Sequence, residues 1–298
     1  MELLAECIDD AYDLGYRQLA LSGGEPMIYP GLAALLEQGK EIGMVTTVTS
    51  NGMLLSPARW KPVAGLVDVL AISIDGRPQE HDRIRGREGA FDRTVANLAT
   101  VRSSGTPFGF IFTLTQHNVD SLDFVVRLAA REGARSVQVH PLTLHGRAAE
   151  RMRGERPDGI ELAAALLGAA LLGRELGVAV HVDAVTVEQL LLHFDAVVPL
   201  RPVRRLADVA PVLVVDPMGR VIPMTHEVSS SLWLGSIFDA SLFELADAWL
   251  AAGGGDLLAE TCEQTWAELT ERRSPQAVYW YDEVAARTRA HLQELALA

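Results

Sequence analysis

Glycines and polar residues cluster directly after several short apolar stretches, and these clusters are the part of the sequence best suited to chemistry. Gly23 and Gly24 let a backbone approach a ligand closely and leave its polar groups available for binding. No catalytic residue stands out among the clusters, which occupy residues 22–26, 50–52, 73–76, 116–118 and 141–146.

An alternation of strands and helices is predicted to position these clusters. Short apolar stretches predict strands at 18–21, 45–49, 67–74, 108–115 and 136–141. Amphipathic or apolar patterns predict helices at 32–41, 57–63, 91–103, 121–132 and 160–176. Such alternation implies parallel strands with right-handed crossovers, here as five consecutive βα units. Because ligands gather at the carboxyl ends of parallel strands, the clusters should converge on one mouth.

The two ends of the chain depart from this alternation. Residues 3–14 predict an amphipathic helix that ends at Gly15, so the chain opens inside a helix. After a possible strand at 178–183, a hairpin is expected around residues 216–219, and helices rich in Ala, Leu and Trp follow from Ser241. The pattern predicts two domains, at 1–190 and 205–298.

Composition excludes several classes of partner. The net charge of −13, with scattered basic residues, argues against nucleic acid, whose phosphates require Lys and Arg. No apolar run reaches the roughly 20 residues of a membrane-spanning helix. The first ten residues carry four acidic side chains, unlike a secretory signal. A cytoplasmic protein with no membrane partner is therefore expected.

Cysteine and histidine usage offers little for metal binding. Cys7 and Cys262 are the only cysteines, so a disulfide framework and a four-cysteine zinc site are both excluded. The histidines lack the compact spacing of zinc ligands, and no metal site is predicted from His81, His140, His145 and His226. His140 precedes Pro141 at a predicted strand end and is a candidate for lining a substrate cavity.

Several strings in the right order resemble the radical S-adenosylmethionine (SAM) superfamily, particularly its peptide-modifying members. They are LALSGGEP, TSNG, AISIDG, HDRIRG, GAF and HPLTLHGRA, and the resemblance covers about residues 1–150. It implies an α/β fold, a partial (βα)6 TIM-like barrel that lacks its first strand and carries a small α+β C-terminal extension.

The resemblance also implies roles for individual residues in binding SAM. Gly23 and Gly24 would hold the methionyl amino group, in a turn that Glu25 and Pro26 complete. Arg85 would bind the SAM carboxylate. The remaining candidates are Ser73 for ribose or carboxylate, Asp75 for shaping its turn, and Asn51 and Asn118 for further polar contacts. An alternative interpretation makes Asn51-Gly52 and Asp75-Gly76 ordinary turns and Arg85 a solvated surface residue.

The family's CxxxCxxC motif, whose thiolates ligate a 4Fe-4S cluster, is missing from this sequence. Because the chain opens in the helix that follows that motif, we expect the first strand and the cluster loop to lie upstream of Met1. An intact form would cleave SAM to a 5′-deoxyadenosyl radical that abstracts hydrogen from a peptide substrate. A flavodoxin or ferredoxin would supply the electron, and the chain as it stands would be inactive.

Two alternatives from other classes remain open. The first is a cluster-free, non-catalytic relative that binds a peptide or a nucleotide at the barrel mouth. The second is an α/β-barrel lyase or aldolase, which would need a Schiff-base lysine. Lys40 and Lys61 are the only lysines, and neither falls at a predicted strand end.

The C-terminal segment resembles the SPASM or twitch extension of peptide-modifying radical SAM enzymes. The resemblance rests on LVVDPMGRVIPMTH and WLGSIFDASLFEL. The family follows this hairpin with a Pro-Cys pair that ligates an auxiliary cluster, whereas here Met224 follows Pro223. Sulfatase maturases then place an aspartate where this chain has Thr225. A degenerate extension without the auxiliary cluster is therefore expected.

Overall fold

The computed structural model describes residues 2–142, 155, 159–271 and 277–297. The chain divides into two compact units. One is Gln18–Asp183, and the other combines Met1–Arg17 with Ala184–Ala298. The sequence pattern placed residues 1–190 together, whereas contacts group the first seventeen residues with the C-terminal part. Among the helices that the structure describes, none is long and apolar enough to cross a lipid bilayer.

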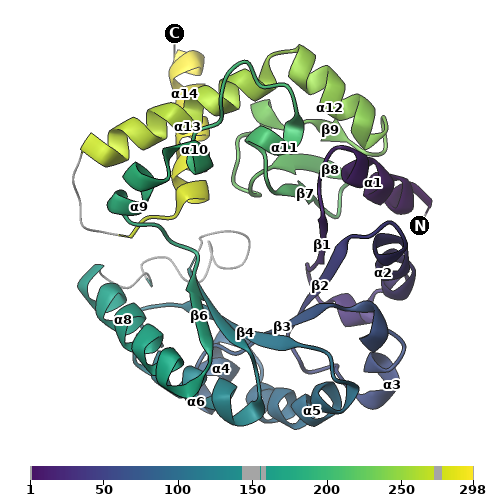
Figure 1. The fold of residues 1–298 in the computed structure, drawn as a ribbon, viewed down its shortest axis with the longest axis vertical. Helices are drawn as coiled ribbons and strands as arrows, with labels where there is room; N and C mark the ends of the chain where they lie inside the picture. Colours follow the sequence, from purple (N-terminus) through teal and green to yellow (C-terminus); the bar gives the residue numbers. More distant parts are fainter. Residues whose placement is uncertain (1, 143–154, 156–158, 272–276, 298) are drawn as a thin grey trace. The chain divides into compact units, whose positions relative to one another are not determined.

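The unit Gln18–Asp183 is built on a six-stranded sheet whose strands follow one another in chain order, all parallel (Figure 1). This arrangement confirms the predicted α/β fold of a partial TIM-like barrel. The strands are β1 (Gln18–Leu21), β2 (Val45–Ser50), β3 (Val69–Ser73), β4 (Phe108–Leu114), β5 (Ser136–Pro141) and β6 (Ala179–Val182).

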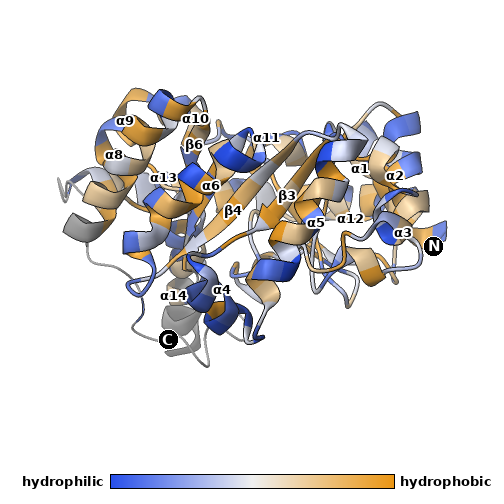
Figure 2. Ribbon diagram, turned by 90° about the horizontal axis from the view of Figure 1, so that it is seen from below, coloured by the Kyte–Doolittle hydropathy of each residue, from blue (hydrophilic) through white to orange (hydrophobic). Residues whose placement is uncertain are grey.

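Helices lie along the outer side of this curved sheet (Figure 1). They are α2 (Leu32–Glu41), α3 (Pro57–Trp60), α5 (Ala90–Ser104), α6 (Leu122–Glu132) and α8 (Gly159–Leu176). Three short 3-10 helices are η1 (Pro26–Ile28), η2 (Ala64–Leu66) and η3 (Val119–Ser121). The sequence did not predict α4 (Pro78–Arg85), which is strongly polar and appears blue in Figure 2.

Alternation along the strands separates an apolar face from a polar one. Phe110 and Phe112 of β4 are fully buried in the hydrophobic core, as are Leu70 and Ile72 of β3. Figure 2 shows β3 and β4 as the hydrophobic centre of this unit. Residues on the opposite face are only half-buried, because side chains of a strand point alternately to its two sides. They include Thr47, Thr49, Thr113, Gln138 and His140.

The second unit combines helices with a three-stranded antiparallel sheet of β7 (Leu213–Val215), β8 (Arg220–Pro223) and β9 (Gly235–Ser236). The predicted hairpin is therefore present. Asp216 shapes its turn by accepting hydrogen bonds from the backbone of Met218 and Arg220 and from the Arg220 side chain. The helices are α1 (Glu2–Asp13), α9 (Val187–Leu192), α10 (Phe194–Val197), α11 (Leu206–Val209), η4 (Ser230–Leu232), α12 (Leu242–Ala251), α13 (Gly254–Glu271) and α14 (Trp280–Leu297).

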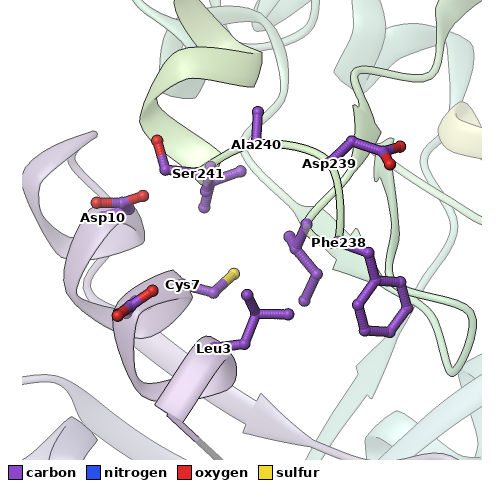
Figure 3. Close-up of a pocket in the computed structure, with 10 residues that line it drawn as sticks. Leu3, Cys7, Asp10, Phe238, Asp239, Ala240 and Ser241 are labelled. Carbon is purple, nitrogen blue, oxygen red and sulfur yellow. The ribbon is translucent and has the colours of Figure 1, made fainter.

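Helix α1 is integral to this second unit. Cys7 lies in the same hydrophobic core as Trp249 and Cys262, and the Asp10 carboxylate accepts a hydrogen bond from the backbone N–H of Phe243 at 3.1 Å. A pocket of about 180 Å³ lies between α1 and the segment that precedes α12. Figure 3 shows Cys7 on one side of this pocket and Phe238 on the other.

A substitution at Gly52, in the loop after β2, tests how tightly this edge of the sheet is packed. Gly52 has φ +78°, and an added Cβ would lie 2.4 Å from Thr94 Cγ2 and 3.0 Å from Ile72 Cγ2. We expect Gly52→Ala to lower the free energy of unfolding by about 2–4 kcal/mol in urea denaturation, because strain and overpacking add. Gly65→Ala, at a position with open space, should change it by less than about 0.5 kcal/mol. Equal effects of both substitutions would contradict this packing.

Candidate functional site

The loops singled out in the sequence follow the carboxyl ends of β1, β2, β3 and β4. Because these strands are parallel and adjacent, the loops lie at one edge of the sheet. The fifth cluster, 141–146, lies outside the described residues from 143 onward, as does His145. The first four loops form the candidate site, and hydrogen bonds join them in two groups.

Glu25 joins the first two loops. Its Oε1 accepts hydrogen bonds from Ser50 Oγ at 2.8 Å and from the backbone N–H of Met27 at 3.2 Å. Its Oε2 accepts one from the backbone N–H of Asn51 at 2.9 Å. Both carboxylate oxygens are therefore bound within the protein. Glu25 holds the turn after β1 against the turn after β2, and the buried Pro26 starts η1 beside it.

The turn at Gly23 and Gly24 is exposed and open. Gly23 adopts φ +111°, a conformation that favours glycine. No heavy atom lies within 4 Å of the position that a Cβ would occupy on either residue. The backbone N–H of Gly23 donates to Ser22 Oγ. A ligand can therefore come close to this backbone without displacing protein atoms.

Asp75 forms the centre of the second group. Its carboxylate is completely buried; Oδ2 accepts a hydrogen bond from Arg85 Nε at 2.6 Å and Oδ1 accepts one from the backbone N–H of Thr113 at 3.1 Å. The Arg85 side chain is about one quarter exposed (26%). Within the described part of the chain, its two Nη nitrogens have no hydrogen-bond partner. Asp75 thus holds the guanidinium group through Nε and leaves the two Nη nitrogens available to a ligand.

His81 supports Asp75 from the interior. Its Nδ1 accepts a hydrogen bond from the backbone N–H of Asp75 at 3.1 Å, and its ring packs edge-on against Phe91. Burial lowers the pKa of His81, and the charge of Arg85 lowers it further against the opposing charge of Asp75. A neutral ring is the form that can accept this hydrogen bond. No motif indicated this role for His81, because its partner is a backbone group.

Asn118 ties the end of β4 to the end of β3. Its Oδ1 accepts from the backbone N–H and the hydroxyl of Thr115, and its Nδ2 donates to the carbonyls of Asp75 and Thr113. These four bonds use the full capacity of a primary amide. The side chain of Asn118 is therefore occupied in holding the two loops together.

Two predicted residues keep polar groups available. The Ser73 hydroxyl makes no hydrogen bond to the part of the chain that the structure describes, and the side chain is almost buried. Asn51 accepts from the backbone N–H of Met53 through Oδ1, which leaves its Nδ2 as a donor. The structure thus brings Glu25 together with Asn51, and Asp75 together with Arg85 and Asn118. Direct contact of any of them with a ligand stays a prediction.

The two cysteines do not fit an iron–sulfur cluster. Burial, with a smaller contribution from Asp10, raises the pKa of Cys7 to about 11, and burial raises that of Cys262 to about 12. Cluster ligands are thiolates, which such environments disfavour. Across the described residues, no group of three or more His, Cys, Asp and Glu side chains is placed to hold a metal ion.

Removing the charge of Asp75 tests its structural importance. Asp75→Asn should lower the free energy of unfolding by about 2–3 kcal/mol, because Arg85 loses its charged partner and an amide can face the N–H of Thr113. Asp92→Asn, on the exposed face of α5, should leave it unchanged within about 0.5 kcal/mol. Urea denaturation measures both free energies of unfolding. An Asp75→Asn protein as stable as the wild type would show that the buried carboxylate contributes nothing to stability.

Sequence comparison finds a family resemblance in the first part of the chain. The profile of the radical SAM superfamily matches residues 1–129. A PqqA peptide cyclase from Ruegeria pomeroyi is 35% identical over 48% of this chain and 38% of its own length. An AdoMet-dependent heme synthase from Methanosarcina barkeri is 34% identical over 48% of this chain and 42% of its own length. The matched region is thus less than half of each of these relatives.

Solved structures share the fold over more of the chain. Streptococcus suis SuiB is 14% identical over 84% of this chain and 59% of its own, with a TM-score of 0.61. The protein anSMEcpe, solved with bound AdoMet and a peptide, is 14% identical over 99% of this chain and 90% of its own, with a TM-score of 0.64. At such identities the likeness concerns the fold alone. The sequence matches carry the family resemblance: residues 1–129 match the profile of the radical SAM superfamily.

Proposed function

We propose that the loops after β1, β2 and β3 bind SAM, and that the protein acts in a radical SAM reaction on a peptide. The observation that carries the proposal is the presence, at one edge of the sheet, of an open glycine turn and an arginine whose end is free. An amino acid has an ammonium group and a carboxylate. The backbone of the open glycine turn is complementary to the ammonium group, and the arginine is complementary to the carboxylate. When bound, SAM would supply the adenosyl group for hydrogen abstraction.

Each residue of the site would have a distinct part in holding SAM. The exposed backbone at Gly23 and Gly24 offers carbonyl oxygens to the methionyl ammonium group. The two Nη nitrogens of Arg85 offer parallel donors to the carboxylate. The Ser73 hydroxyl and Asn51 Nδ2 are further polar groups for the ribose or the carboxylate. Glu25, Asp75 and Asn118 would act indirectly, by fixing the loops that carry these groups.

Preorganisation favours binding at this site. A free arginine side chain has many rotamers, and a ligand that immobilises it loses binding free energy to that entropy. Here the hydrogen bond from Arg85 Nε to buried Asp75 already orients the guanidinium. The Glu25 bonds likewise fix the position of the glycine turn relative to Asn51. The site is therefore largely formed before a ligand arrives.

Comparison with relatives favours a peptide over other substrates. The sequence relatives include both a peptide cyclase and heme synthases, so the matched region alone does not select one class. The structures that resemble most of the chain include SuiB bound to its precursor peptide SuiA, at a TM-score of 0.62 over 84% of this chain. They also include anSMEcpe with a bound peptide, over 99% of it. This shared architecture supports a peptide substrate.

The role proposed for this chain is limited to binding SAM and the substrate. Radical SAM chemistry also uses a 4Fe-4S cluster and an electron donor such as a flavodoxin or ferredoxin. The described residues supply no thiolate set for that cluster, so none of them is assigned to the cleavage of SAM. Direct binding of SAM by the chain is accordingly the first property to test.

Replacement of Arg85 by lysine tests its contact with the carboxylate. Lysine keeps a positive charge for Asp75 but lacks the planar pair of donors. We expect Arg85→Lys to weaken SAM binding roughly tenfold, as measured by heteronuclear NMR titration. Arg83→Lys, at an exposed position of the same helix, should leave it unchanged. 5′-Methylthioadenosine has no carboxylate, so neither substitution should change its binding. If Arg85→Lys weakened the binding of SAM and of 5′-methylthioadenosine equally, Arg85 would not contact the carboxylate.

A side chain at Gly24 tests the approach of the ligand to the turn. Because open space surrounds this position and its φ is not left-handed, Gly24→Val should preserve the thermal unfolding midpoint. The added side chain would occupy the space proposed for SAM, and binding should fall at least tenfold, a loss of about 1.4 kcal/mol. Full SAM affinity in a folded Gly24→Val protein would exclude this turn from the site.

A further inference from the structure

A second polar cluster lies on the inner face of the sheet, on β5 and at the end of β6. Asp183 directly follows β6, and its Oδ2 forms an ion pair with His140 Nδ1. Its Oδ1 accepts a hydrogen bond from Gln138 Nε2 at 3.0 Å. His181 completes the cluster, since it is the β6 partner of Gln138 in the strand register. Both oxygens of Asp183 are therefore bound to residues of β5.

The contacts leave one nitrogen of His140 available. With Nδ1–H directed at Asp183, a neutral imidazole carries its lone pair on Nε2. Nε2 makes no hydrogen bond to the described part of the chain, and the His140 side chain is 37% exposed. A histidine oriented by a carboxylate in this way is the arrangement of a general base.

Electrostatics keep Asp183 in the charged form that this role needs. Burial alone would raise the pKa of Asp183. The hydrogen bonds from His140 and Gln138, together with the charges of His140 and His181, outweigh burial and lower the pKa. The ionised carboxylate accepts a hydrogen bond from Nδ1–H, which fixes the tautomer and the orientation of the His140 ring.

The dyad lies near the candidate SAM site. Thr113 of β4 is the register partner of His140 on β5, and neighbouring strands are about 4.8 Å apart. The backbone N–H of the same Thr113 binds Asp75, which holds Arg85. Only strand β4 thus separates His140 from Asp75, at the same edge of the sheet.

We propose that His140, oriented by Asp183, is an acid–base residue of the substrate site and acts on a weakly acidic O–H or S–H group of the substrate. In the step, the O–H or S–H bond breaks, its electron pair stays on oxygen or sulfur, and the proton binds Nε2. No oxidant or reductant takes part. This inference rests on the proposed function for the presence of a substrate beside SAM, but the reactivity of the dyad can be measured without it.

Diethyl pyrocarbonate, which acylates neutral imidazole nitrogen, measures that reactivity residue by residue through peptide mass spectrometry. We expect His140 to react faster than His181, and Asp183→Asn to slow His140 by on the order of tenfold, with partial recovery in Asp183→Glu. His193, an exposed residue of the other unit, should react at the same rate in all three proteins. An unchanged His140 rate in a folded Asp183→Asn protein would overturn the proposal.

Two further measurements assign the dyad to the substrate. His140→Gln should bind SAM as the wild type does; a loss of SAM affinity would assign His140 to SAM and overturn the substrate role. In the wild type, NMR titration with N-acetylserine methylamide and N-acetylcysteine methylamide should shift the His140 ring signals, and the stronger response identifies hydroxyl or thiol. No shift with either would overturn the substrate contact. Failure of the wild type to bind SAM, with a reactive dyad, would instead count against the proposed function alone.

Discussion

The candidate site depends on a buried carboxylate. Asp75 lies at the end of β3 without solvent exposure, and its charge is compensated by Arg85 and by the backbone of Thr113. An isolated charge in such a place would be prohibitively unfavourable, so the surrounding groups have little freedom to move. Three elements are fixed as a result: the end of β3, helix α4 through Arg85, and β4 through Thr113. The orientation of the arginine that the proposed ligand would meet follows from this one pair.

Parallel pairing extends that local order across the sheet. Because each strand is joined to the next in chain order, all the strand ends face one edge, and groups from distant parts of the sequence become neighbours. Glu25 and Asn51 are connected there, and so are His140 and Asp183.

Much of the fold was predictable, because local patterns determine it. The bounds of β1 and β5 agree with the prediction, since short apolar runs between turn residues leave few alternatives. Helix α4 was missed because its residues are almost all polar and its stability comes from its ends: Glu80 accepts from the N–H of Arg77, and Gly86 ends the helix. The placement of α1 with the C-terminal unit depends on packing over long sequence distances, which no local pattern encodes.

The candidate site was predictable in its location and less so in its contacts. The parallel topology placed the loops at one edge, as the alternation of elements implied. Which groups bind each other depends on strand register, and register is not visible in a single motif. Glu25 was expected to complete the glycine turn, but its bonds to Ser50 and Asn51 of the next loop could not be foreseen. Asp183 drew no attention because its partner His140 lies on another strand.

The discontinuous second unit has a consequence for how the chain folds during synthesis. Asp10 and its hydrogen-bond partner Phe243 are 233 residues apart in sequence. Synthesis proceeds at roughly 5–20 residues per second, so helix α1 is made well before the segment that covers it. Meanwhile the intervening sheet, whose strands each pair with the next one made, can assemble progressively. The amphipathic face of α1 thus stays uncovered while that sheet forms.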